Sequence, residues 1–222
     1  MTNRTLAARD LAHIAIFAAL IAALGLPGAL SIGAVAVPIT FQTLGVMLAG
    51  AILGARKGFF AVALFLALAA AGLPLLSGGR GGLLWFTISP STGYLYGWLL
   101  AAVVIGYLTA RLLPRYPFWP AVGATALGGI VAVYLIGVPV TAINLGLPLW
   151  VALFDSAKFL PGDLLKVVVT VLVARQVHRA YPGFIAPLGR RSASSAAPVA
   201  VNAEPANAKP ANAKPANAEN AG

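Results

Sequence analysis

An aspartate and a lysine lie three residues apart inside an apolar stretch, where charged side chains are rare. The stretch reads Phe159-Leu160-Pro161-Gly162-Asp163-Leu164-Leu165-Lys166. Pro161 suits the first turn of a helix, which places Asp163 where the helix dipole favours an anion. Lys166 shares that face, roughly 4.5 Å deeper. A charge at the centre of a membrane helix costs roughly 2.5–3.5 kcal/mol, so the pair is either a structural ion pair or, as we favour, part of a ligand site.

A second cation stands among glycines, in the stretch Ser77-Gly78-Gly79-Arg80-Gly81-Gly82. Glycines give the backbone the freedom to bring N–H groups and a guanidinium close to an anion. The pattern is not a Walker loop, because GxxxxGK[ST] is missing. We interpret it either as a flexible connector with a solvated arginine or as a clamp for a carboxylate or phosphate, able to move like a lid.

Other polar residues give weaker indications. Gln42 ends a short apolar run, and its amide can contact a ligand or cap the chain locally. We expect Asn144, Asp155 and Lys158 to be exposed loop residues. Tryptophans near expected helix ends are typical interfacial anchors; they are Trp85, Trp98, Trp119 and Trp150, of which the first and last can also line an outer pocket.

These residues do not combine into a catalytic set. The chain has no cysteine, which excludes a thiol nucleophile and a cysteine-ligated metal. His13 and His178 stand alone, so we expect no metal site and no catalytic dyad. A hydrolase needs an activated nucleophile or a metal. We therefore predict a protein that is not an enzyme and uses no cofactor, while Asp163 and Lys166 leave an intramembrane acid–base enzyme as an alternative.

The composition predicts the elements that hold these residues. Of 222 residues, 60% are hydrophobic and 9% charged, and the mean hydropathy is +0.90. A soluble fold could not cover its surface with so few charges. About 20 apolar residues cross a bilayer as a helix. We predict an all-α membrane protein with six transmembrane helices, at 11–30, 42–54, 58–73, 93–113, 119–143 and 160–177. Arg56 and Lys57 separate the second and third segments and indicate a tight helical hairpin there.

The basic residues indicate the topology. Ten of them fall on one face if six helices are threaded: Arg4, Arg9, Arg56, Lys57, Arg111, Arg115, Arg175, Arg179, Arg190 and Arg191. The opposite face carries only Arg80 and Lys158. The positive-inside rule therefore predicts that both termini are cytoplasmic. It also explains the formal charge of +10 without nucleic-acid binding.

The end of the chain has a different character. Residues 202–218 repeat Asn-Ala-Lys/Glu-Pro with an alanine, and such a stretch cannot build an apolar core. We predict a six-helix substrate-binding domain at 1–190 and a disordered, low-complexity cytoplasmic tail at 191–222.

Small residues recur at helical spacing in the first segment. Ala15, Ala19 and Ala23 lie four apart, as do Ala18 and Ala22. Small side chains let helices approach closely in lipid. The pattern indicates either internal packing or a docking surface for another membrane protein.

Four motifs, in order over about 150 residues, resemble the BioY family. They are Pro38-Ile39-Thr40-Phe41-Gln42-Thr43-Leu44, Gly54-Ala55-Arg56-Lys57-Gly58, the stretch from Gly72-Leu73-Pro74 to Gly82, and Leu160–Lys166. The family's Pro-Thr-Gly-Gly-Tyr stretch is Pro90-Ser91-Thr92-Gly93-Tyr94 here, with the two middle positions replaced.

The resemblance implies an S component of an energy-coupling factor (ECF) transporter in a bacterial inner membrane. Such a protein binds biotin near its outer face, and its partners are a transmembrane coupling protein and two ABC ATPases. The alanines of the first helix would dock on the coupling protein. We expect Asp163, Lys166, Arg80, Gln42, Gly79, Gly81 and Tyr94 to bind the substrate.

Biotin's chemistry suits the charged residues. Asp163 would accept from a ureido N–H, Lys166 would donate to the ureido carbonyl, and Arg80 would neutralise the carboxylate. The reverse assignment, with Lys166 on the carboxylate, stays open. Other interpretations are an S component for a different small vitamin and a purely structural membrane protein.

Overall fold

Helices make up the described part of the chain, which comprises residues 7–28, 37, 39–185 and 188 of the computed structural model. In chain order they are α1 (Ala8–Ala23), α2 (Gln42–Leu48), the π-helix η1 (Ala49–Leu53), α3 (Gly54–Ala70), α4 (Leu84–Thr87), α5 (Thr92–Leu112), α6 (Phe118–Ala126), the π-helix η2 (Leu127–Ala132), α7 (Val133–Leu145), α8 (Leu149–Ser156), the 3-10 helix η3 (Ala157–Phe159) and α9 (Leu160–Ala180). The described residues form no strand, and the all-helical prediction is confirmed.

Three helical runs are apolar and long enough to cross a membrane: 42–70, 92–112 and 118–145. Large apolar side chains are exposed on these runs, as at Leu135 (69%) and Trp119 (77%). Soluble monomers rarely expose apolar surface so extensively, which indicates that these faces contact lipid. The number of six spans and the cytoplasmic position of both termini stay predictions.

The chain reverses direction at Gly54, so the run 42–70 is two helices rather than one rod. Gly54 has a φ of +81°, which glycine adopts without strain. A Cβ on Gly58 would lie 2.9 Å from the carbonyl oxygen of Ala49, whereas nine residues of straight helix span about 13 Å. This confirms the predicted hairpin, with Arg56 and Lys57 in the first turn of α3.

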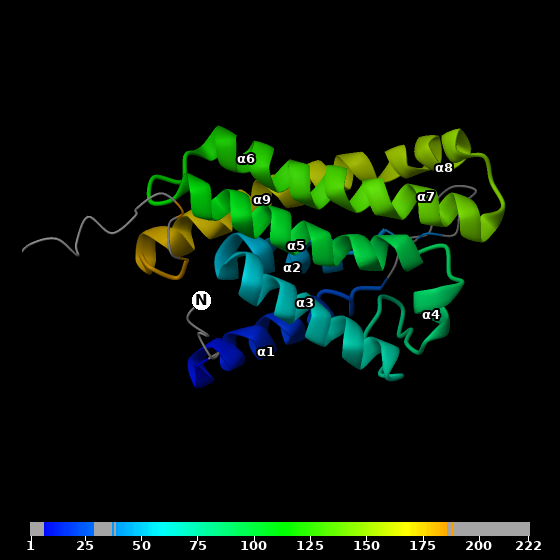
Figure 1. Ribbon diagram of the computed structural model, residues 1–222, viewed down its shortest axis with the longest axis horizontal. Coiled ribbons are helices and arrows are strands. Elements are labelled where there is room, and N and C mark those ends of the chain that lie inside the picture. Colours follow the sequence, from blue (N-terminus) through cyan, green and yellow to red (C-terminus); the bar gives the residue numbers. More distant parts are fainter. Residues whose placement is uncertain (1–6, 29–36, 38, 186–187, 189–222) are drawn as a thin grey trace, which may run out of the picture. The chain divides into compact units, whose positions relative to one another are not determined.

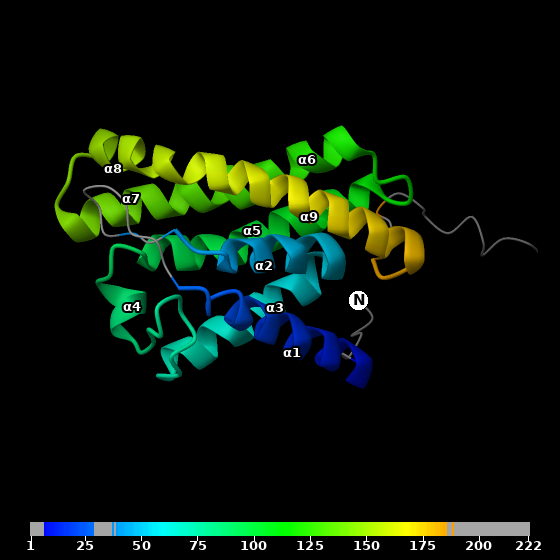
Figure 2. The same cartoon turned by 180° about the vertical axis from the view of Figure 1, so that it is seen from behind.

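Helix α5 lies between α3 and α7, while α9 packs against α2 and α6 (Figures 1 and 2). Close approach of α5 to the hairpin depends on Gly106, where a Cβ would lie 2.1 Å from the Ala55 nitrogen. Tight packing of this kind fixes the distances between side chains on different helices.

Some elements differ from expectation. Helix α1 ends at Ala23 rather than near 30, because Pro27 cannot continue a helix. The short helices α4 and α8 fall in stretches expected to be loops. The chain divides after Gly189, and the predicted tail at 191–222 lies outside the described residues.

Candidate functional site

Five segments that are distant in sequence enclose a cavity. The free space, counted with its open mouth, is about 690 Å³. Its lining comes from the start of α2 and the residues before it, the glycine-rich stretch, the first half of α5, the η2–α7 junction and the start of α9. The lining residues that bear on the argument are Gln42, Thr43, Arg80, Trp85, Tyr94, Trp98, Tyr134, Phe159, Asp163 and Lys166.

Asp163 and Lys166 form a buried ion pair at the cavity wall. Pro161 lies in the first turn of α9 and Asp163 in the same turn, as predicted. The lysine Nζ lies 3.0 Å from Asp163 Oδ1, and the two side chains are 9% and 7% exposed. Helix α9 therefore presents both charges to the cavity from adjacent turns.

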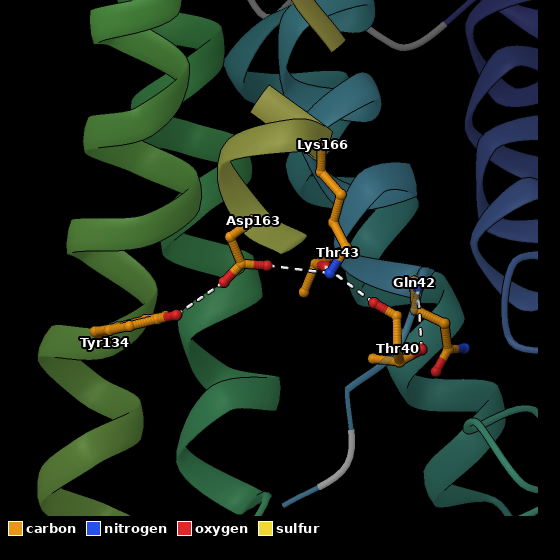
Figure 3. A network of polar contacts seen from close by, with 6 residues as sticks. All are labelled: Thr40, Gln42, Thr43, Tyr134, Asp163 and Lys166. Carbon is orange, nitrogen blue, oxygen red and sulfur yellow. Dashed lines mark hydrogen bonds and ion pairs between the residues drawn. The ribbon is translucent and has the colours of Figure 1, made fainter. Parts of the chain in front are cut away.

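Two hydroxyl groups complete this network (Figure 3). The Tyr134 hydroxyl donates to Asp163 Oδ2 at 2.8 Å. Lys166 Nζ donates to Thr43 Oγ1 at 2.9 Å. Each carboxylate oxygen thus accepts one protein hydrogen bond and keeps capacity for another, and Lys166 has three N–H donors, of which these contacts use two. The pair can accept from and donate to a neighbouring ligand at the same time.

Tyr134 and Thr43 were not expected in the site. Tyr134 lies in a long apolar stretch where an aromatic side chain indicates core or lipid contact. Thr43 sits beside the Gln42 that was singled out. Buried charged and hydroxyl groups need hydrogen-bond partners, so partners for Asp163 and Lys166 could be expected. Sequence spacing does not show which helices meet, and so it could not identify them.

Arg80 lies at the cavity in an ordered stretch of chain. Its Nε donates to the Ser77 carbonyl at 2.7 Å, and its guanidinium carbon lies 4.7 Å from the Trp85 ring centre. Paired backbone hydrogen bonds join residue 80 to Leu76, at 2.9 and 3.1 Å. These contacts favour the clamp over a loose connector with a solvated arginine.

The terminal nitrogens of Arg80 are available to an anion. Within the part of the chain that the structure describes, no carboxylate lies within ion-pair distance of this guanidinium. Partial burial lowers the pKa of Arg80 from its ordinary value, which is high enough that the group stays cationic at neutral pH. A carboxylate entering the cavity would meet an uncompensated positive charge.

Gly79 and Gly81 do not line the cavity; they shape the chain beside it. Gly79 has a φ of +71°, a conformation that favours glycine. A Cβ on Gly81 would lie 2.2 Å from the Leu73 carbonyl oxygen. The structure thus gives both glycines a role in the path of the backbone, and their contact with a ligand stays a prediction.

Tyr94 and Gln42 line the cavity with their polar atoms already bonded to protein. The Tyr94 hydroxyl lies 2.7 Å from Ser156 Oγ, and its ring packs edge-on against those of Tyr134 and Phe159. The Gln42 side chain is 1% exposed and bonds three backbone groups. Tyr94 therefore offers a ligand mainly its ring.

The residues expected in exposed loops are partnered and partly buried. Asp155 and Lys158 form an ion pair of 2.6 Å, each side chain 13% exposed. Asn144 donates to the Ser89 carbonyl at 2.8 Å. That expectation was wrong because Asn144 lies in α7, while Asp155 and Lys158 lie in α8 and η3, and α8 packs against α7.

The tryptophans divide by position. Trp119 and Trp150 are 77% and 63% exposed, whereas Trp85 lines the cavity. Trp98 is only 3% exposed and packs against Phe65. The expectation of an interfacial anchor is wrong for Trp98, because α5 lies between two other helices.

The alanines of α1 point in two directions. Ala15, Ala19 and Ala23 are exposed, whereas Ala18 is buried and Ala22 partly buried. The second series serves packing within the protein. Only the exposed series, which we call the alanine stripe, is available to a partner.

Known proteins resemble this chain over most of its length. A model of the BioY family matches residues 1–183. The biotin transporter BioY of Rhizobium etli is 47% identical over 182 residues, which cover 78% of this chain and 95% of that protein. The biotin transporter BioY of Rhodobacter capsulatus is 49% identical over 184 residues, with the same coverage, 78% and 95%.

A solved structure shares the fold. The crystal structure of the S-component for biotin from an ECF-type ABC transporter superposes with a TM-score of 0.75 at 34% identity. The match covers 83% of this chain and 97% of that chain.

Replacing one member of the buried pair should destabilise the protein more than replacing both. Asp163→Asn leaves the Lys166 ammonium buried without its anion, which costs about 3–5 kcal/mol. The double variant Asp163→Asn/Lys166→Met removes that penalty and should recover most of the loss. Thermal unfolding of the detergent-purified protein without ligand measures both.

Asp10→Asn is the control, since it breaks the more exposed Asp10–Lys57 pair of 3.2 Å and should change unfolding little. Equal destabilisation of the single and double variants would contradict the assignment of a mutually dependent pair.

Proposed function

Because the chain belongs to the BioY family, we propose that it binds biotin and serves its uptake as the S component of an ECF-type transporter. The observation that carries the proposal is the Asp163–Lys166 pair, held 3.0 Å apart at a cavity that Arg80 and several aromatic side chains also line. Buried charges with spare hydrogen-bonding capacity are typical of binding sites rather than of inert cores.

The spare capacity of the pair matches a cyclic urea. Asp163 accepts from a ureido N–H, and the third N–H of Lys166 donates to the ureido carbonyl. The apolar ring of biotin then packs against Trp98, Phe159 and the Tyr94 ring, which line the same cavity. Analogues that lack the urea would leave these spare hydrogen-bonding positions unfilled and would bind more weakly.

Arg80 completes the site by binding the carboxylate tail. Its guanidinium stacks on Trp85 and has no carboxylate partner among the described residues. A charge-assisted hydrogen bond between guanidinium and carboxylate would hold the tail. The opposite orientation, with Lys166 on the carboxylate, predicts different analogue selectivity.

Our proposal for the topology is six spans with both termini in the cytoplasm of a bacterial cell, the protein lying in the cytoplasmic membrane. The bias of basic residues supports this orientation. It puts Arg80 and the start of α9 toward the outside, where biotin enters.

The partners we propose are a transmembrane coupling protein and two ABC ATPases. The alanine stripe is the docking surface, since small exposed residues let a second helix approach closely. The sequence contains no GxxxxGK[ST] motif, and in this proposal the ATPases supply the energy for transport.

Labelled biotin should bind the detergent-purified protein saturably, with one site per chain. Asp163→Asn should weaken binding by about 10- to 100-fold, because it replaces a charge-assisted hydrogen bond. Equilibrium binding to the monodisperse fraction separates this effect from unfolding. Absence of binding by the unaltered protein, or chemical turnover of bound biotin, would overturn the proposal.

Biotin amidated at its carboxylate should distinguish the two orientations. Arg80→Ala should weaken binding of the free acid about tenfold and leave the amide nearly unaffected, since the lost interaction involves a charged partner. Lys166→Ala should weaken both ligands alike. If Lys166→Ala alone abolishes the preference for the free acid, the reverse orientation is correct.

A bulky residue on the alanine stripe should separate binding from transport. Ala19→Trp should reduce uptake of labelled biotin by cells at least about tenfold, because the partner helix can no longer approach closely. Binding to the purified variant should stay unchanged.

Leu135→Trp, at an exposed position on α7, is the matched control and should leave uptake intact. Equal loss of uptake in the two variants would exclude the stripe as the docking surface.

A further inference from the structure

Gln42 is bonded on all sides by backbone groups of other segments. Its Nε2 donates to the Ile21 carbonyl at 3.2 Å and to the Leu75 carbonyl at 2.9 Å. Its Oε1 accepts from the Ser77 N–H at 2.9 Å. Both amide donors are used and one acceptor lone pair remains. The side chain therefore has little left to offer a ligand, although it lies at the cavity.

The segments that Gln42 joins include the one that carries Arg80. Oε1 fixes the Ser77 N–H, and the carbonyl of the same Ser77 accepts from Arg80 Nε at 2.7 Å. Ser77 Oγ also donates to the Gly28 carbonyl at 2.6 Å. Ser77 therefore connects the Gln42 amide to the Arg80 guanidinium through its own N–H and carbonyl groups.

The backbone at Gly25 packs closely against the amide of Gln42. A Cβ on Gly25 would lie 2.8 Å from Gln42 Nε2, a separation that real side chains do not reach. A side chain at position 25 would therefore push the amide of Gln42 aside. Gly25 is absent from the cavity lining, so a substitution there disturbs the amide without touching a ligand.

We propose that Gln42 is a positioning residue, which holds Arg80 in place for the carboxylate of the ligand through Ser77. The inference rests on the proposed biotin-binding function. It assigns to Gln42 neither a direct ligand contact nor a local cap, but a bond across 35 residues of sequence. Loss of the amide would let the guanidinium move and weaken only the interaction with the tail.

The test compares biotin with its amide on Gln42→Met, a variant of similar length without hydrogen bonds. Binding of the free acid should weaken about tenfold, as for loss of a charge-assisted bond, and binding of the amide by less than about twofold. Adding Arg80→Ala should weaken acid binding no further, because both changes remove the same interaction.

Gly25→Ala should reproduce the selective loss and keeps the test open if Gln42→Met does not fold. Asn144→Ala is the matched control, since it removes a side-chain amide that holds the Ser89 carbonyl outside the cavity lining. Asn144→Ala should change the affinities for acid and amide equally or not at all.

Equal weakening of acid and amide binding by Gln42→Met, additive with the effect of Arg80→Ala, would establish direct contact and overturn the positioning role. Unchanged binding of both ligands would also overturn the positioning role. If the unaltered protein binds neither acid nor amide, it is the proposed function that fails.

Discussion

The buried ion pair at the start of α9 is the constraint on which the rest of this structure depends. An ammonium and a carboxylate removed from water are costly, and their mutual attraction offsets the cost only with good geometry and additional hydrogen bonds to both groups. Here one oxygen of Asp163 receives Lys166 and the other receives Tyr134, while Lys166 also reaches Thr43. Three helical segments must therefore stay in register for two charges to remain inside the protein.

The helix packing supplies that register with small residues. The reversal at Gly54 sets α2 beside α3, and Gly106 lets α5 come within contact distance of the turn. Met47, on α2, occupies the space that a side chain at Gly129 would need. Each glycine removes a Cβ at a helix crossing, so Thr43 and Tyr134 approach α9 from different sides (Figure 3).

Much of the fold could be predicted from the sequence because lipid limits a chain to a few solutions. The apolar stretches and the proline at the start of α9 predicted the boundaries of most long helices to within a few residues. The C-terminal end of α1 and the existence of α8 were not predicted, since α8 has only eight residues and resembles a loop in sequence. The unusual cost of charge in lipid drew attention to Asp163 and Lys166, and glycine flanks drew attention to Arg80. No sequence feature marks Tyr134, whose role depends on its hydrogen bond to Asp163 on α9.

The ion pair receives its further hydrogen bonds from the protein itself, and this bears on how a ligand would bind. With Tyr134 and Thr43 in place, neither charge depends on a guest molecule for its partners. Under the proposed function, Asp163 and Lys166 keep these protein partners whether or not biotin lies in the cavity. The free energy of binding would then come from the unused hydrogen-bonding positions of the pair and from Arg80, rather than from rescue of an unpaired buried charge.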